Sequence, residues 1–436
     1  MAKKTIARRQ FLGAAGALGA GFFLSSCGDS GKAGTTATGP GPNAGKKPIL
    51  IGITSDSTGQ YANSGAEDRR GMLLAIHEFN EKGGVLGRKI ETIHQDTQTA
   101  PAVGTSVARK MIDSDKVAFL IGGVQSGVAN AISIVAQEAG VIYLNTNSSS
   151  PSEAGKSAHR TKFVWDGNGS NFTAATVKFH VKSVGKKWLL LTNDYGWGRD
   201  TSAATRVHCA ANGAEIVDEL LVPQNTRDFS SYLLKIQQLK PDVVAVAVGG
   251  DDLKVLRAQV SDLKLGDKPV WVINQQDWPD VYGLNVEKLF GTFGTTWYYR
   301  LPYPGVAELV ARYQKLFPDA DIKNPGNVFF NGYMSTRELL RAVERAGTTN
   351  NHKVIQQLEN LRVKAADRLQ EFDAYMNPKT HHLQQTIYLA QQNPSPKEKD
   401  DIFKIIGSVT PDEAEDKNAV NEAKLESLEE TPVYEP

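Results

Sequence analysis

The feature that most constrains this chain of 436 residues is an alternation of short β-rich runs with segments of helical period. Residues 49–53 (ILIGI) form an apolar run that is typical of a strand. The segment 65–82 places Met72, Ile76 and Phe79 at helical spacing. Strands that alternate with helices predict βαβ units and a parallel sheet, so we expect an α/β fold.

The same pattern occurs twice along the chain. The expected strands are 49–53, 89–95, 117–121 and 141–144, then 188–192, 215–222, 243–248 and 270–273. The expected helices are 65–82, 103–112, 126–139, 198–212, 230–239 and 253–263. We therefore predict two doubly wound parallel-sheet lobes.

Extended segments near 293–300 and 372 indicate that the chain crosses between the lobes three times. The expected domains are an N-terminal lobe (48–166 and 295–372) and a C-terminal lobe (167–294 and 373–410). The remaining residues, 411–436, are rich in Asp and Glu and are expected to form a solvated or loosely packed tail.

Residues 1–27 are typical of an export signal rather than of a folded segment. A basic start leads to Arg8-Arg9, which resembles the twin-arginine signature, and a short apolar stretch ends in the lipobox-like sequence Leu24-Ser25-Ser26-Cys27. About 13 apolar residues are too few to span a bilayer, so we expect lipidation at Cys27 instead of a transmembrane anchor. Residues 28–47, rich in Gly, Ser, Thr, Ala and Pro, predict a flexible linker.

Composition excludes several classes of function. The formal net charge is +1, which gives no electrostatic footprint for nucleic acid. The two cysteines cannot form a disulfide framework. No metal-ligand spacing is found, and no Gly-x-Gly-x-x-Gly follows a strand, so we expect neither a metal nor a cofactor, and no catalytic residues.

One family shares several motifs with this chain between residues 49 and 388. The shared sequences are 51–58, 80–90 (NEKGGVLGRKI), 108–112, 119–122, 194–198 (DYGWG), 228–230 and 240–242, together with Gly59, Gly65, Gly71, Asp96 and Gln98. These residues resemble the branched-chain amino acid and amide binding proteins of ABC importers, the type I periplasmic binding proteins. The resemblance implies two lobes that close around a small solute, permease subunits as partners, and an exported protein at the cell envelope.

In open α/β sheets, ligands bind beyond the carboxyl ends of strands. Ser126 follows the third expected strand at the start of a helix, where free N–H groups suit a carboxylate, although it could equally be a helix cap. Asn147 and Ser149 follow the fourth strand, in a loop that the resemblance assigns to the ligand's ammonium and carboxylate. An ordinary turn is the alternative for this loop.

The remaining candidate ligand contacts come from several different segments of the chain. The resemblance places Tyr195 at the first turn of the second lobe, where it would close over the ligand beside Trp197. Trp165, just before the first crossing, is either a ligand contact or a hinge residue. Where the family often has a Glu for the ligand's ammonium, this chain offers Gln275, Gln276 or Asp277.

Asp251, after Gly249-Gly250, is a second candidate cation partner. An Asp at the family's Glu position favours an amino acid ligand, whereas a Gln favours an amide or a carboxylate without an amine. We thus expect a lipoprotein that captures a small polar solute and delivers it to a permease. The alternative is a ligand-sensing receptor component that uses the same clamshell without transport.

Overall fold

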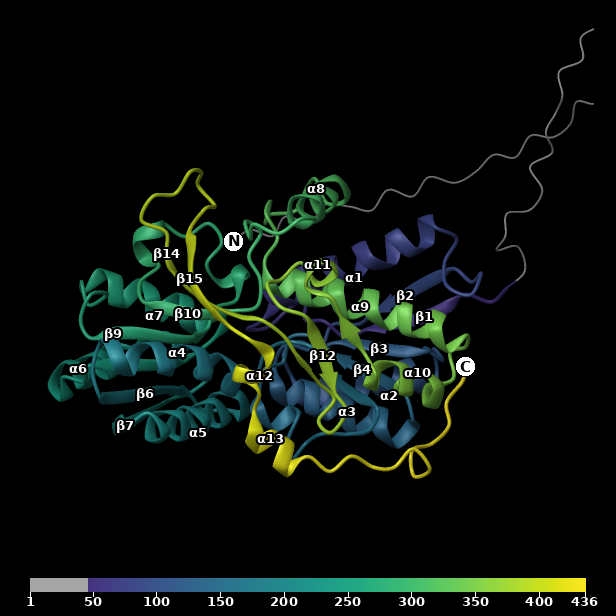
Figure 1. The fold of residues 1–436 in the computed structure, drawn as a ribbon, viewed down its shortest axis with the longest axis horizontal. Helices are drawn as coiled ribbons and strands as arrows, with labels where there is room; N and C mark the ends of the chain where they lie inside the picture. The colour runs from purple at the N-terminus through teal and green to yellow at the C-terminus, as the bar shows by residue number, and fades with distance from the viewer. Residues whose placement is uncertain (1–45) are drawn as a thin grey trace, which may run out of the picture. The chain divides into compact units, whose positions relative to one another are not determined.

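Two sheets, each with helices against it, organise residues 46–436, which the computed structural model describes as part of one compact unit (Figure 1). The predicted export signal (1–27), its Cys27 and residues 28–45 of the linker lie outside the described residues. Among residues 46–436, no helix is both long and apolar enough to cross a membrane.

The N-terminal lobe is built on an eight-stranded sheet of order β11-β12-β13-β5-β4-β3-β1-β2. Its strands are β1 (Ile49–Ile53), β2 (Ile90–His94), β3 (Phe119–Gly122), β4 (Ile142–Asn145), β5 (Lys162–Val164), β11 (Arg362–Val363), β12 (Ala374–Asn377) and β13 (His382–Gln384). Its helices are α1 (Ala62–Glu81), α2 (Pro101–Asp113), α3 (Ser126–Ala139), the 3₁₀ turn η1 (Pro151–Glu153), α9 (Asn327–Ala346), α10 (Asn351–Glu359) and α11 (Ala365–Arg368).

The C-terminal lobe is built on a seven-stranded sheet of order β15-β14-β10-β9-β8-β6-β7. Its strands are β6 (Lys187–Asn193), β7 (Glu215–Val222), β8 (Val243–Ala247), β9 (Val270–Gln275), β10 (Thr292–Thr295), β14 (Ile387–Gln392) and β15 (Phe403–Val409). Its helical segments are α4 (Gly169–Ser183), α5 (Gly196–Ala211), α6 (Ser230–Leu239), α7 (Gly250–Asp262), η2 (Trp278–Asp280) and η3 (Val286–Lys288).

The two lobes repeat one topology. The parallel strands run in the order β2-β1-β3-β4-β5 in one sheet and β7-β6-β8-β9-β10 in the other. Strands such as β8 (VVAVA) are buried along their whole length, as central parallel strands are when helices cover both faces of the sheet. The prediction of two doubly wound α/β lobes is confirmed.

The third crossing between the lobes differs from the prediction. Residues 374–384 were expected in the C-terminal lobe, but β12 and β13 extend the N-terminal sheet, where His382 pairs with Val164. The third crossing between the lobes therefore lies between β13 and β14. The predicted boundary at 372 was wrong because β12 and β13 form a hairpin that adds strands to the edge of the first sheet before the chain leaves it.

The acidic C-terminal tail is not loosely packed. It forms α12 (Pro411–Ala414) and α13 (Lys417–Glu422), then runs to the N-terminal lobe and ends beside α10, as the yellow trace in Figure 1 shows. There the Tyr434 hydroxyl donates to the Val117 carbonyl (2.8 Å) and its N–H donates to Asn351 (2.9 Å). Composition misled the prediction, because a few apolar and hydrogen-bonding residues suffice to anchor an otherwise charged segment.

Helices α1 and α9 cross closely in the N-terminal lobe, and α9 was not predicted. A Cβ added to Gly71 would lie 2.1 Å from the Phe329 carbonyl oxygen, and one added to Gly332 would lie 2.3 Å from the Asp68 carbonyl oxygen. The two glycines therefore let the backbones of α1 and α9 approach each other. This crossing positions Asp68 and Asn331 behind the site described below.

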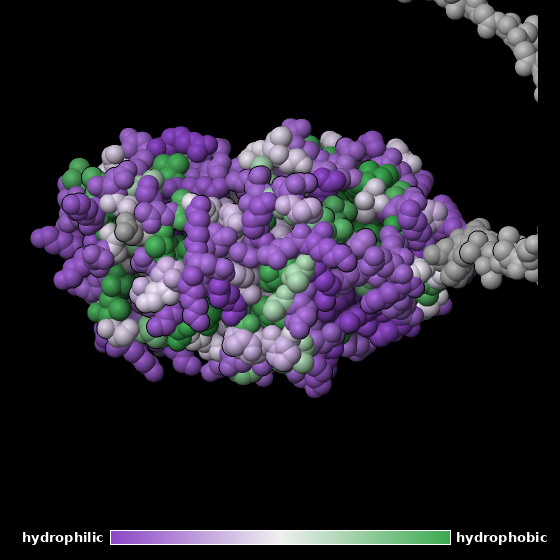
Figure 2. All heavy atoms as spheres, turned by 90° about the horizontal axis from the view of Figure 1, so that it is seen from above, coloured by the Kyte–Doolittle hydropathy of each residue, from purple (hydrophilic) through white to green (hydrophobic). Residues whose placement is uncertain are grey.

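Side chains on the outside of the molecule are mostly hydrophilic on the face that Figure 2 shows, with hydrophobic residues scattered among them. Large exposed hydrophobic side chains lie on different elements, for example Ile134 on α3, Phe179 on α4 and Leu234 on α6. Isolated exposed apolar residues of this kind are normal for a water-facing surface.

Candidate functional site

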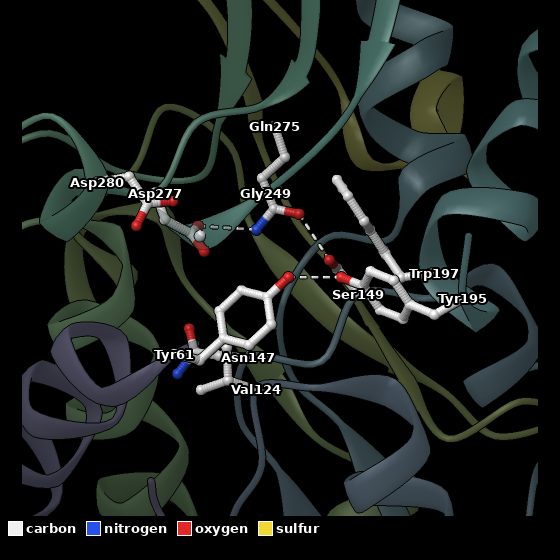
Figure 3. Close-up of a pocket in the computed structure, with 11 residues that line it drawn as sticks. Tyr61, Val124, Asn147, Ser149, Tyr195, Trp197, Gly249, Gln275, Asp277 and Asp280 are labelled. Atoms are coloured by element: carbon white, nitrogen blue, oxygen red, sulfur yellow. Dashed lines mark hydrogen bonds between the residues drawn. The ribbon is translucent and has the colours of Figure 1, made fainter. Parts of the chain in front are cut away.

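A small cavity lies where the carboxyl ends of strands from both lobes meet (Figure 3). Most of its lining residues lie at or shortly after the carboxyl ends of strands, in agreement with the rule for open α/β sheets. From the N-terminal lobe these are Tyr61, Val124, Asn147 and Ser149, and from the C-terminal lobe Tyr195, Trp197, Gly249, Gly250, Gln275, Asp277 and Asp280.

The cavity is nearly filled by its own walls. The space open to the centre of a water molecule is about 30 Å³. That volume holds a few water molecules at most, so a solute of amino acid size does not fit without a movement of the walls.

Two tyrosines close the cavity from opposite lobes. The hydroxyls of Tyr61 and Tyr195 are 2.6 Å apart and share a hydrogen bond, as the dashed line in Figure 3 shows. Burial, followed by the other tyrosine, raises the pKa of Tyr61 well above its ordinary value, and burial raises that of Tyr195. Both phenols are therefore neutral. The ring of Trp197 stands 6.1 Å from that of Tyr195 and completes an aromatic wall.

Gln275 connects the two lobes through its amide. Its Oε1 accepts a hydrogen bond from the Ser149 hydroxyl at 2.6 Å, and its Nε2 donates to Asp166 at 2.8 Å and to Asp277 at 2.9 Å. Ser149 and Asp166 belong to the first half of the chain, whereas Gln275 ends β9. The side chain thus orients groups from both sides of the cavity.

Two carboxylates face the cavity from the turn η2, which follows β9. Asp277 accepts hydrogen bonds on Oδ1 from Gln275 and from Asn327 Nδ2 (2.8 Å). Burial raises the pKa of Asp277. Burial first, and then the charge of Asp277, raise the pKa of Asp280 to about 7.

Asn147 is held by a polar layer behind the cavity. Its Nδ2 donates to Asp68 Oδ1 at 2.8 Å, and its Oδ1 accepts from Asn331 Nδ2 at 3.1 Å. Asn331 also donates to Asp166 at 2.8 Å. Asp68 and Asp166 are fully buried, and burial raises the pKa of both well above the ordinary value.

Of the residues predicted from sequence, the structure brings five together at the cavity: Asn147, Ser149, Tyr195, Trp197 and Asp277. Ser126 lies one step behind them. It begins α3, whose cap is Gln125, and its Oγ accepts a hydrogen bond from the Trp197 N–H at 3.2 Å. Ser126 thus contacts the other lobe without lining the cavity.

Three predicted residues lie away from the cavity. Trp165 is fully buried in the N-terminal core, 5.9 Å from the Arg368 guanidinium, because its bulk fills that core. Asp251 forms an ion pair with Lys254 (3.2 Å) one turn along α7. Gln276 points the other way from Gln275 and accepts from Arg257 at 2.6 Å, as alternation along an extended chain requires.

Sequence reasoning named Gln275 among the residues of its segment but missed other lining residues, chiefly Tyr61 and Asp280. Asp280 lies shortly after Asp277, so extending that segment by a few residues would have found it. Tyr61 ends the loop that joins β1 to α1, and the position of this loop beyond a strand end was the available signal. Among residues 46–436, no group of three or more His, Cys, Asp or Glu side chains is arranged to hold a metal ion.

Comparison with known proteins agrees with this architecture. A family model described as periplasmic binding protein matches residues 48–399. The Leu/Ile/Val-binding protein BraC3 of Rhizobium johnstonii is 30% identical over 217 residues, which are 49% of this chain and 58% of the relative. The Leu/Ile/Val-binding protein homolog 2 of Brucella abortus is 25% identical over 70% of this chain and 81% of the relative. The match to BraC3 spans little more than half the length of that relative.

Solved structures share the fold. A periplasmic binding protein from Burkholderia mallei superimposes with a TM-score of 0.79 at 24% identity, over 86% of this chain and 98% of its own. A leucine-, isoleucine-, valine-, threonine- and alanine-binding protein from Brucella ovis, in a closed conformation, gives 0.75 at 20% identity over 87% and 99%. A Rhodopseudomonas palustris solute-binding protein in complex with 3,4-dihydroxybenzoic acid gives 0.74 at 20% identity over 84% and 98%.

Proposed function

Because this chain belongs to the periplasmic binding protein family, we propose that it is the substrate-binding component of an ABC importer. It captures a small polar solute between its lobes and delivers it to membrane permease subunits. The observation that supports this most is the cavity itself, which is lined by four residues of the N-terminal lobe and seven of the C-terminal lobe. A solute that touches both walls stabilises the closed arrangement of the lobes.

The solute enters by separation of the lobes. Because the cavity of about 30 Å³ is too small for it, the contacts that span the cavity must open first. Among these contacts are the Tyr61–Tyr195 hydroxyl pair, the Ser149–Gln275 hydrogen bond and the hydrogen bond from Gln275 to Asp166. The first two join uncharged groups and are worth about 1 kcal/mol net each, so polar groups of the solute can replace them.

The residues that hold the solute are those that line the cavity. Asn147 and Ser149 offer an amide and a hydroxyl from one lobe, and Tyr195 and Trp197 offer aromatic surface from the other. Asp277 accepts hydrogen bonds from an amino group of the solute. Ser126 acts through the backbone of Trp197 rather than by direct contact.

The protein works at the cell envelope, in keeping with the family to which it belongs. We propose that residues 1–27 direct its export, that Cys27 carries the lipid anchor and that residues 28–47 form the tether. A Cys27→Ala variant would then be released from the membrane fraction and would no longer incorporate labelled palmitate. Retention of the variant in the membrane would contradict the anchor.

A thermal-shift screen tests the binding function. The protein without residues 1–45 is heated with amino acids, amides, aliphatic and aromatic carboxylates, and amines. A solute that binds only the folded state adds about 2.7 kcal/mol of stability at 100 times its Kd, and so raises Tm. A shift from one chemical class, abolished by Asp277→Asn, is the expected result. No shift from any class would contradict the proposed function.

A further inference from the structure

The cavity is surrounded by acidic side chains. Asp277 and Asp280 line it, and Asp68 and Asp166 lie directly behind it, hydrogen-bonded to Asn147 and Gln275. The lining includes no Lys, Arg or His. A buried carboxyl group either pairs with a cation or keeps its proton, because an uncompensated charge is costly away from water.

Within residues 46–436, none of these four carboxyl groups has a cationic partner at hydrogen-bonding distance. The side chains that donate to them are neutral amides and hydroxyls, for example Thr146 to Asp68 (2.7 Å) and Asn327 to Asp277 (2.8 Å). The nearby cations are engaged elsewhere. Lys254 pairs with Asp251, and the guanidinium groups of Arg257 and Arg368 donate to glutamine side chains.

Positions that would suit a negatively charged group of a solute are already taken by the protein. Helix N-termini at the cleft offer free N–H groups to anions. At α3, the Val128 N–H donates to Gln125 Oε1 (2.8 Å), and at α5, the Trp197 N–H donates to Ser126 Oγ (3.2 Å). At α7, the backbone N–H of Gly250 lies near the Asp280 carboxyl group and favours its ionised form. A carboxylate on the solute would therefore compete with the protein's own acceptors.

A second, independent feature points to a ligand here. The Nε1–H of Trp197, a side chain that is only 7% exposed and lines the cavity, has no hydrogen-bond partner in the part of the chain that the structure describes. One such donor suits a hydroxyl, ether or carbonyl oxygen. The faces of Tyr61, Tyr195 and Trp197 also attract a cation through their ring quadrupoles.

We propose that the solute is a small organic cation, whose amine is not balanced by a carboxylate of its own. Asp277 and Asp280 accept its N–H groups, and the aromatic wall of Tyr61, Tyr195 and Trp197 packs against it. This inference rests on the proposed function and narrows its solute class. Leucine-like zwitterions and benzoate-like anions are excluded as preferred solutes.

Matched ligand pairs test the inference by titration calorimetry on the protein without residues 1–45. Isoamylamine differs from leucine only by the carboxylate, and benzylamine carries an aminomethyl group where benzoate carries a carboxylate. Putrescine is included as a dication. We expect an amine to bind at least about tenfold more tightly than its carboxylate-bearing counterpart. Tighter binding of leucine or benzoate would overturn the inference and leave the proposed function standing. No binding by any compound would overturn both.

Two variants test whether the amine binds to the carboxyl group of Asp280. Asp280→Asn should weaken the binding of the amine by at least about tenfold, since a buried carboxylate partner is lost. Asp262→Asn makes the same change at an exposed position near the end of α7 and should leave the affinity unchanged. The Tm of Asp280→Asn should not fall at neutral pH, because the neutral amide avoids the cost of burying a charge. Equal affinity of Asp280→Asn and the native protein for the amine would contradict the role of Asp280.

Discussion

At the scale of single residues, Asp280 is the side chain whose protonation state matters most for the charge of the cleft. It lies 5% exposed, opposite Tyr61 and close to Asp277. From α7, the Gly250 N–H, Lys254 and the distant Arg257 favour its ionised form, while Asp251 opposes it. Burial outweighs the favourable groups and raises its pKa from 3.8 to about 7.

The raised pKa of Asp280 predicts that both the stability of the protein and its affinity for an amine depend on pH. In the ligand-free protein, the folded state holds a proton that the unfolded state releases, so the stability contributed by Asp280 falls as pH rises from about 4 to about 7. An amine binds the ionised carboxylate, so its affinity should rise over the interval from about pH 5 to about pH 7 and then level off. Calorimetry at several pH values measures both.

The matched control for the pH dependence is Asp280→Asn. Removing this titrating group should reduce the pH dependence of the affinity and of the stability together, leaving the contribution of the other buried carboxyl groups. An affinity that stays constant, or that falls as pH rises toward 7, would show that the solute does not bind the ionised form of Asp280.

The sequence predicted the residues that follow strands better than those that depend on tertiary packing. Asn147, Ser149 and Tyr195 follow strands that apolar runs identify, so their place at the cleft follows from topology. Trp165 follows a strand as well, yet its indole turns into the core. Side-chain direction after a strand end depends on the neighbours across the sheet, and these were not readable from the chain alone.

At the scale of elements, the crossing of α1 and α9 sets the rear wall of the cleft. Gly71 lies where the backbone of α9 leaves no room, since an added Cβ would be 2.1 Å from the Phe329 carbonyl oxygen. We predict that Gly71→Ala lowers the free energy of unfolding by at least about 2 kcal/mol, because the helices must separate. Urea unfolding measures the loss.

Gly407→Ala provides the control for that prediction. Gly407 is exposed on β15, and nothing lies within 4 Å of a Cβ added there. Its substitution should change the free energy of unfolding by no more than about 0.5 kcal/mol. Similar effects of the two substitutions would refute the close crossing.

The C-terminal segment is the second element whose role the structure defines. It ties to the N-terminal lobe through Tyr434, and Glu426 accepts from the Arg160 N–H at 3.0 Å. We predict that Tyr434→Ala lowers the free energy of unfolding by about 1–3 kcal/mol, because a buried hydrogen bond and ring contacts are lost. The neighbouring Val433, 67% exposed, is the control, and Val433→Ala should be neutral. An equally neutral Tyr434→Ala would show that the segment is not anchored there.

Elements between β10 and β14 were harder to predict than those of the repeated halves. Helix α9 has the amphipathic sequence pattern that predicts a helix, yet it is buried on almost every side, polar side chains such as Asn331 and Glu338 included. The hairpin of β12 and β13 joins the sheet of the N-terminal lobe, although the chain passes through the C-terminal lobe between β5 and β12. Pairing between segments so distant in sequence leaves no local signal in the chain.

At the scale of the whole molecule, the two lobes function as one unit only if the solute bridges them. The contacts that span the cavity join side chains about 100 residues or more apart, such as Ser149 and Gln275. Some of them join uncharged groups, as the Tyr61–Tyr195 hydroxyl pair does, and a solute that bridges the lobes can take their place. A cleft that binds through one lobe alone would have no means of reporting its occupancy to a permease.

The most direct test of this account is a titration of the bound solute against one variant from each lobe. Ser149→Ala removes a hydroxyl of the N-terminal lobe, and Asp277→Asn removes a charge of the C-terminal lobe. We predict that each variant remains folded and that each weakens binding, by about fivefold or more for Ser149→Ala and by more for Asp277→Asn. Binding that depends on only one of the two lobes, or on neither, would contradict a solute held between them.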